Sequence, residues 1–198
     1  MARYRLISAG VALLLFVSHH QILAEESIDV PVEPLSEKVA QAILHSCADA
    51  EGQVGTLMLR ERVSDEGLKL VDVELRISSD LIEAGKHAVH IHETANCTPC
   101  GAAKGHFDPG PHSNSSPDGN HPFHMGDLPN IEVDENHQGT LLTTTSRITL
   151  SDGPLSIFDA DGSAVIVHVN ADTYCPHGED AGCAGGARAA CGLIQHAE

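Results

Sequence analysis

The most regular feature of the chain is a strict alternation of apolar and polar residues in its first half. The apolar positions are Val71, Val73, Leu75 and Ile77, and the polar ones between them are Asp72, Glu74, Arg76 and Ser78. Successive side chains of a strand point to opposite faces, so this period of two predicts a half-buried β-strand. Six further segments are predicted to be strands: 39–45, 53–60, 87–93, 130–135, 140–148 and 164–169.

Turn signals separate these predicted strands. Glycine follows acidic or polar residues at 50–52, 65–67, 136–139 and 159–162, whereas no stretch has a convincing helical period. Seven or eight short strands with such turns predict an all-β sandwich or barrel. Two longer segments break the rhythm, 94–128, which is rich in Gly, Pro, His and Asn, and 171–187, which is rich in Gly, Ala and Cys. Each follows a strand with histidine near its end, so we expect both to be functional loops.

The N-terminal segment predicts export. Arg3 and Arg5 precede an apolar run over 6–18, and the run is followed by a small-residue site ending at Ala24. This is the order of a secretory signal peptide, and the apolar run is shorter than the ~20 residues of a membrane span. We therefore assign 1–24 to a signal peptide, 25–36 to an acidic mobile leader and 37–198 to the folded domain. The mature chain is expected to be exported without a membrane anchor, to a periplasm or an extracellular space.

Charge and composition limit which partners and which kind of site this chain can have. The 11 Lys and Arg residues are outnumbered by 28 Asp and Glu residues, which gives a formal net charge of −17. Such a surface repels polyphosphate, so nucleic acid is excluded as a partner. Aromatic residues are scarce at 3%, whereas the chain has 14 His and 6 Cys. This combination points to metal chemistry.

The cysteines have two readings. Outside the cytosol, cysteines are expected to form disulfides, and six of them allow 15 pairings among which the sequence does not choose. The alternative is a structural zinc site, because Cys97 and Cys100 have the spacing of half a zinc knuckle. No second such pair exists in the chain, so we favour disulfides.

The histidines suggest two metal-binding sets. His90 and His92 are two apart on a predicted strand and therefore face the same side, and His168 ends another apolar strand. Imidazole ligands suit copper or zinc and do not suit calcium or magnesium. His106, His124 and Asp127 offer a mixed set that suits zinc. Taken alone, Asp127 is better explained as the cap of a turn.

Several motifs in one order resemble the copper/zinc superoxide dismutase family. They are His90-Ile91-His92-Glu93, Cys97, Gly105-His106-Phe107-Asp108-Pro109, His124-Met125-Gly126-Asp127-Leu128-Pro129 and the ending from Gly185 to Ile194. The resemblance covers 39–194, and Leu128-Pro129-Asn130 is more similar to the bacterial exported branch. It implies an eight-stranded Greek-key β-barrel, a flattened sandwich, with two long functional loops.

The resemblance also implies a site with two cofactors, a copper ion and a zinc ion. Copper would be bound by His90, His92, His106 and His168. Zinc would be bound by His106, which bridges the two ions, by His124 and Asp127, and by one more histidine. The spacing of this last ligand departs from the family pattern, and we favour His112 over the alternative, His121. Asp172 matches the aspartate that orients ligand histidines, and Cys97 and Cys191 match the family disulfide.

The implied reaction is dismutation of superoxide to oxygen and hydrogen peroxide by a redox-cycling copper. Arg188, the only Lys or Arg after Arg147, would bind the anion. Many relatives steer superoxide with lysines in the last long loop, whereas segment 173–187 has none and offers His177, Glu179 and Asp180. We therefore expect either that another group, such as Lys104, steers superoxide toward the site, or that superoxide associates more slowly than in those relatives.

Other expectations rest on position and on rival functions. We expect Cys175 and Cys183 to pair within the last loop, which leaves Cys47 and Cys100 to pair by elimination. One rival function is an exported protein that sequesters copper or zinc, and another is a zinc hydrolase with Glu93 as its acid or base. The sequence is compatible with either a monomer or a homodimer.

Overall fold

Antiparallel strands account for almost all regular structure in this computed structural model, which describes residues 38–48, 52–109, 124–174 and 182–197. The elements in this part of the chain are β1 (Lys38–Ser46), β2 (Gln53–Val63), β3 (Lys69–Ser78), β4 (Gly85–His92), the 3₁₀ helix η1 (Cys100–Ala103), β5 (Asp127–Val133), β6 (Gln138–Thr145), β7 (Ala164–His168), β8 (Arg188–Leu193) and β9 (Gln195–His196).

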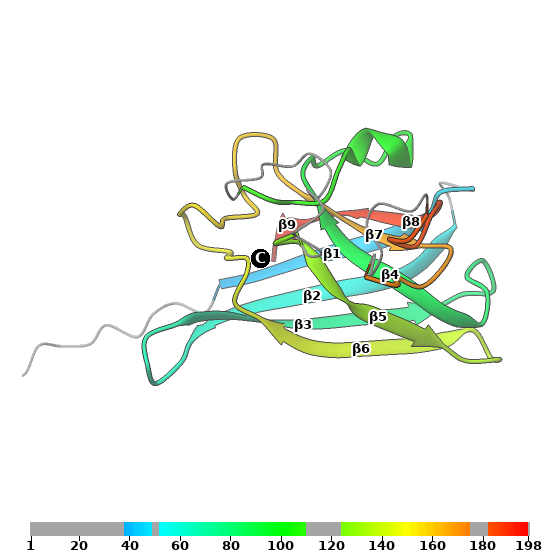
Figure 1. Cartoon of the computed structure of the whole chain (residues 1–198), viewed down its shortest axis with the longest axis horizontal. Coiled ribbons are helices and arrows are strands. Elements are labelled where there is room, and N and C mark those ends of the chain that lie inside the picture. Colours follow the sequence, from blue (N-terminus) through cyan, green and yellow to red (C-terminus); the bar gives the residue numbers. More distant parts are fainter. Residues whose placement is uncertain (1–37, 49–51, 110–123, 175–181, 198) are drawn as a thin grey trace, which may run out of the picture. The chain divides into compact units, whose positions relative to one another are not determined.

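Eight of these strands close into a barrel. The hydrogen-bonded order is β2-β3-β6-β5-β4-β7-β8-β1, and β1 pairs again with β2, while the short β9 extends β8 along β1. β4, β5 and β6 are consecutive neighbours, and β7 returns to lie beside β4 (Figure 1). This arrangement is a Greek key. The predicted eight-stranded barrel is confirmed.

The barrel has two thin seams that divide it into two sheets. β5 pairs with β6 through the single residue pair Val133 and Gly139, and β1 pairs with β8 at only two positions. The long ladders lie within β1, β2, β3 and β6 on one side and within β5, β4, β7 and β8 on the other. The barrel is therefore a flattened sandwich, because in the described part of the chain its two sheets are joined only by the short β5–β6, β1–β8 and β1–β9 ladders.

The sequence pattern was wrong about two strands: it gave one of them the wrong bounds and did not predict the other. The strand predicted for 140–148 runs over 138–145, and the chain then leaves the sheet for a third long connection over 146–163. β8 was not predicted as a strand, because its small residues have no clear alternation. Its pairing with β7 and β1 makes it a strand, so tertiary contacts override its weak local preference.

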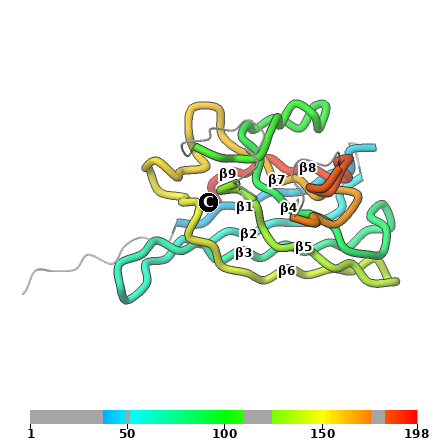
Figure 2. Tube along the Cα trace, in the orientation of Figure 1, coloured from blue at the N-terminus to red at the C-terminus, as the bar shows by residue number. Residues whose placement is uncertain are grey.

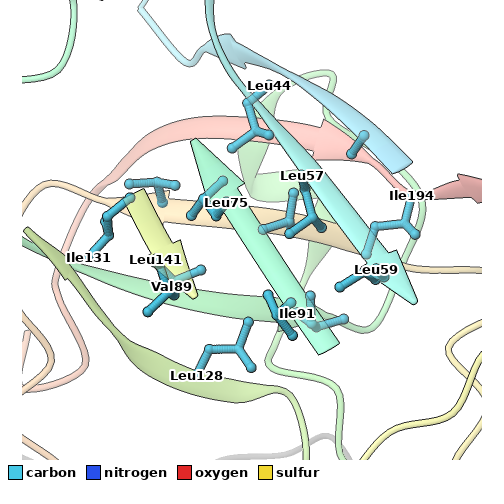
Figure 3. Close-up of a cluster of buried hydrophobic side chains, with 14 of the residues drawn as sticks. Leu44, Leu57, Leu59, Leu75, Val89, Ile91, Leu128, Ile131, Leu141 and Ile194 are labelled. Atoms are coloured by element: carbon cyan, nitrogen blue, oxygen red, sulfur yellow. The ribbon is translucent and has the colours of Figure 1, made fainter. Parts of the chain in front are cut away.

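Aliphatic side chains fill the barrel interior (Figure 3). Leu44, Leu57, Leu75, Val89 and Ile91 come from four different strands and are almost fully inaccessible to solvent. Phe107 is the one aromatic residue among the largest fully buried side chains of the described part. Burial of this apolar surface is the main contribution to folding, at ~25 cal/mol per Å².

The boundaries proposed for the signal peptide and the leader lie within 1–37, outside the described residues, and they stay predictions. The compact unit that contains the barrel spans Ser36–Glu198. No helix in the described ranges is long or apolar enough to cross a membrane.

Glu61 ties the long 146–163 connection to β2. Its Oε2 accepts the backbone N–H groups of Leu150 at 2.5 Å and of Ser151 at 2.9 Å. Burial alone would raise the pKa of this carboxyl, but the hydrogen bonds from Ser151 and Leu150 outweigh it and lower the pKa. The ionised carboxylate is therefore the form that stabilises this connection.

We expect Glu61→Ala to lower the free energy of unfolding by about 1–3 kcal/mol, because the buried N–H of Leu150 and the partly buried N–H of Ser151 lose their acceptor. The lowered pKa means that this stabilisation is complete above the ordinary glutamate pKa and is lost as the pH falls through the lowered value. Urea unfolding measures both effects. The control is Glu132→Ala, at an exposed position of β5; an equal loss in both variants would contradict the role of Glu61.

Candidate metal centre

The outer face of β4 and β7 carries three imidazole rings. Val89 and Ile91 of β4 point into the barrel core, so His90 and His92 lie on the opposite face. On β7, Val165 and Val167 point into the core, and His168 lies on the same outer face as His90 and His92. All three histidines are nevertheless buried, because segments of the long loops cover this face.

The 93–126 connection adds a fourth ring, from His106. Glu93 N–H donates to Gly105 O at 3.0 Å and Phe107 N–H donates to Ile91 O at 2.8 Å, so residues 105–107 pair alongside the end of β4. His92 and His106 are opposite each other in this bridge. The ligand atoms of His90, His92, His106 and His168 all lie within 4.8 Å of one another.

His106 also belongs to a second cluster. One ligand atom from each of His106, His124 and Asp127 lies within the same 4.8 Å limit. Asp127 begins β5 directly opposite His90. Its Oδ1 accepts from His106 Nδ1 at 2.7 Å, and its Oδ2 accepts the backbone N–H of His124 at 2.8 Å. Asp127 therefore caps the turn and also faces His106, a position that is compatible with both readings.

Acceptor oxygens fix the orientation of the three strand histidines. His90 Nε2 donates to Asp172 Oδ2 at 2.8 Å, His92 Nδ1 to Lys104 O at 2.9 Å, and His168 Nδ1 to Gly186 O at 3.0 Å. In a neutral imidazole the other nitrogen then carries a lone pair. Those nitrogens, His90 Nδ1, His92 Nε2 and His168 Nε2, are buried and have no hydrogen-bond partner. Three unpartnered lone pairs gathered at one place fit a bound metal ion.

Asp172 is held in place by Asn130. The Asn130 side chain donates to Asp172 O at 3.0 Å and accepts Asp172 N–H at 2.8 Å. Asp172 Oδ1 accepts the Tyr174 N–H at 2.6 Å, which leaves Oδ2 for His90. Asn130 was not identified as a site residue from the sequence, although it belongs to the Leu128-Pro129-Asn130 motif.

Arg188 begins β8 opposite His168. Its Nη1 donates to Cys100 O and its Nη2 donates to Lys104 O. Lys104 O therefore serves both Arg188 and His92, and Lys104 adopts a left-handed backbone conformation with φ 60°. No pattern in the sequence indicates this role, because it belongs to a backbone carbonyl.

Close packing brings the last loop against these strands. A Cβ atom at Gly185 would lie 2.6 Å from Ala88 Cβ and 2.7 Å from His168 Cβ, and its φ is 90°. Only glycine fits this approach. The neighbouring Gly186 can therefore present its carbonyl to His168 Nδ1.

Burial keeps His92, His106 and His168 neutral. It is the largest cause that lowers the pKa of His168, to about 3, and electrostatic repulsion between the rings adds to the effect. Burial also lowers the pKa of His92 and of His106, although for His106 the hydrogen bond to Asp127 acts in the opposite direction. Burial would raise the pKa of Asp127, but its hydrogen bonds to His106 and His124 outweigh this, and the pKa is lowered. Neutral imidazoles and an ionised carboxylate are the forms that bind metal.

Two disulfides join the loop before His106 to the barrel. Cys97 is bonded to Cys191 and Cys47 to Cys100. Cys183 is also in a disulfide. Cys175 lies outside the described residues, so the Cys175–Cys183 pairing stays a prediction. His112 and His121, the two candidates for the remaining zinc ligand, lie outside them as well.

The comparisons agree on one family. A family model described as copper/zinc superoxide dismutase matches residues 53–194. The chain is 39% identical over 126 residues to the superoxide dismutase (Cu-Zn) of Deinococcus radiodurans, a match covering 58% of this chain and 65% of the relative. It is 38% identical over 123 residues to the enzyme of that name from Legionella pneumophila, covering 60% and 69%.

Relatives named only as similar to superoxide dismutases also match. The superoxide dismutase-like protein YojM of Bacillus subtilis is 32% identical over 174 residues, covering 83% of this chain and 82% of that protein. The crystal structure of a SOD-like protein from Bacillus subtilis superposes with a TM-score of 0.59 at 28% identity, covering 77% of this chain and 96% of that one. The matched motifs, the barrel and the two histidine clusters together place this chain in the copper/zinc superoxide dismutase family, a family of oxidoreductases whose cofactors are copper and zinc.

Proposed function

We propose that this chain dismutates superoxide with one copper and one zinc ion bridged by His106. The observation that carries the proposal is that His106 is a member of both metal-binding clusters. His90, His92, His106 and His168 would hold copper. His106, His124 and Asp127 would hold zinc, with His112, or His121 in its place, as the remaining ligand. Bound copper would supply the one-electron redox chemistry that dismutation of superoxide needs.

His106 is suited to move a proton. Its Nδ1 faces Asp127 at 2.7 Å, on the zinc side. Its Nε2 is then the nitrogen available to the other cluster and, when not bound there, to a proton. Contacts on both sides limit rotation of the ring, which stacks on His90 with centroids 3.9 Å apart and meets the His124 ring edge-on at 4.9 Å. A proton held at Nε2 would therefore stay directed at the anion that forms when superoxide gains an electron.

Arg188 would bind superoxide, the substrate anion. It is the strand partner of His168, and two backbone carbonyls fix its guanidinium. Burial lowers its pKa, but an arginine starts from so high a value that it stays charged. A fixed positive charge beside a ligand histidine suits a small anion. A protein that only sequesters metal has no need of it, and this separates the dismutase from the sequestration alternative.

We also propose that the mature protein is exported, to a periplasm or to an extracellular space. Two described disulfides support an oxidising compartment. A measurement of its mass in solution distinguishes a monomer from a homodimer.

We expect the copper- and zinc-loaded chain to catalyse superoxide dismutation and His168→Ala to lose most of that activity, because copper loses one of its four ligands. The measurement is superoxide decay followed by pulse radiolysis, at matched metal content. Equal turnover in the two proteins would refute the proposal, and metal binding without turnover in the parent would favour sequestration. Anomalous diffraction at the copper and zinc edges, on crystals of the loaded chain, would show whether the two ions lie on either side of His106.

The lowered pKa of His168 predicts how acid affects the metal-free chain. Between its ordinary value near 6.5 and about 3, the folded chain binds fewer protons than the unfolded chain. The free energy of unfolding should therefore fall as the pH is lowered through this window. In His168→Ala the fall should be shallower, as urea unfolding at pH 7 and pH 4 will show. Identical pH dependence in the two proteins would be inconsistent with a neutral buried His168.

We expect added salt to slow the reaction less than in relatives with lysine-lined loops. Lys104 Nζ lies 3.7 Å from Asp161 Oδ2 on the surface, so its charge is largely offset. Long-range attraction of an anion is the part of association that salt screens. Rates at ~10 mM and ~150 mM salt should differ by less than about twofold, in the parent and in Lys104→Gln alike. A steep fall in the parent would contradict this.

A further inference from the structure

The Cys47–Cys100 disulfide lies on a closed ring of contacts that begins and ends at Arg188. Cys47 directly follows β1, and its N–H donates to Ala189 O at 2.8 Å, one residue after Arg188 on β8. The disulfide leads from Cys47 to Cys100, and Cys100 O accepts Arg188 Nη1. The backbone next to Arg188 and its own guanidinium are therefore connected through one covalent cross-link.

The segment that carries Cys100 has little stability of its own. η1 is a single 3₁₀ turn of four residues, and its N-cap, Pro99, provides no side-chain cap. Such short turns depend on tertiary contacts for their position. Ala103 packs at 0% exposure with Ala164, Ile166 and Cys191, which places η1 over β7 and β8 (Figure 2). At the first residue of the turn, Cys100, the covalent tie is the bond to Cys47.

The two carbonyls that hold Arg188 are anchored separately. Lys104 O is next to Gly105, whose carbonyl accepts Glu93 N–H at 3.0 Å beside the end of β4. Lys104 is therefore held by strand-like pairing at Gly105 in addition to the bond from its own N–H to Gly101 O of η1 at 3.2 Å, so the Cys47 cross-link is not its only anchor. Cys100 O is fixed through the disulfide. Loss of the disulfide should release Nη1 while Nη2 and the His92 contact to Lys104 O remain, so the guanidinium loses its orientation but the copper ligands do not.

From this ring we propose that the Cys47–Cys100 disulfide is a positioning device for Arg188, which sets its guanidinium for anion binding. The disulfide does not touch the anion and acts through the Cys100 carbonyl. The inference rests on the proposed function only in taking Arg188 as the anion-binding residue. It assigns the Cys47–Cys100 cross-link a role distinct from that of Cys97–Cys191, which ties the start of the loop to β8.

The test is a double-mutant cycle with azide as the anion probe, read by optical titration of the copper- and zinc-loaded chain. We expect Cys47→Ser/Cys100→Ser to raise the azide dissociation constant about tenfold, the size of one charge-assisted hydrogen bond, at unchanged copper content. In an Arg188→Ala background the same pair of substitutions should change azide binding less than about twofold, because the residue that the disulfide positions is gone.

Leu59→Ala serves as the control for lost stability, because Leu59 is fully buried in the barrel core on β2, and it should leave azide affinity unchanged. Cys47→Ala/Cys100→Ala is prepared in parallel in case the serine pair does not fold. Unchanged azide affinity without the disulfide would overturn the proposal, as would a loss of equal size with and without Arg188. Failure of both pairs to retain copper would also overturn it, since the disulfide would then serve the fold. The azide cycle is independent of turnover, so a parent chain that does not dismutate superoxide would refute the proposed function alone.

Discussion

Antiparallel pairing of β4 with β7 is the constraint on which the site depends. Val89 lies opposite Val167 in this ladder, and both point into the barrel core. Because side chains alternate along a strand, burial of these residues forces His90, His92 and His168 onto the outer face. A shift of the register by one residue would exchange the core for the ligands. The hydrophobic core and the metal centre are thus two faces of the same pairing.

The three strand histidines buried on the outer face have a hydrogen-bond partner for one ring nitrogen only. Asp172 and the carbonyls of Lys104 and Gly186 take one nitrogen of each strand histidine, while the second nitrogen is left toward the cluster. An unpartnered buried polar atom costs about 1–3 kcal/mol, so three of them are expensive in the metal-free chain. A bound ion offsets this cost. The geometry of the three histidines is therefore consistent with a family whose members bind copper and zinc.

The loops are ordered by cross-links where they lack regular structure. Cys97–Cys191 and Cys47–Cys100 attach two points of one irregular segment to the barrel, three residues apart. Arg188, the first residue of β8, donates to two carbonyls at and near that segment, those of Cys100 and Lys104. The Arg188 guanidinium, which would bind the substrate, is thereby held as firmly as the histidine rings. Arg188 begins β8, a strand that no pattern in the sequence predicted.

The sequence by itself determined the strands with clear alternation, an all-β class of either sandwich or barrel, and the histidines at 90, 92, 106, 124 and 168, because burial period and ligand chemistry are properties of residue type and spacing. It left the two readings of Asp127 open, missed β8 and extended β6 too far. Only the tertiary structure decided which carbonyl orients each imidazole, how Asn130 holds Asp172 and which cysteines meet. Every residue has a backbone carbonyl, so residue type carries no information about where that carbonyl points. Contacts such as Asn130–Asp172 and Cys97–Cys191, between residues 42 and 94 positions apart, arise only when the barrel closes.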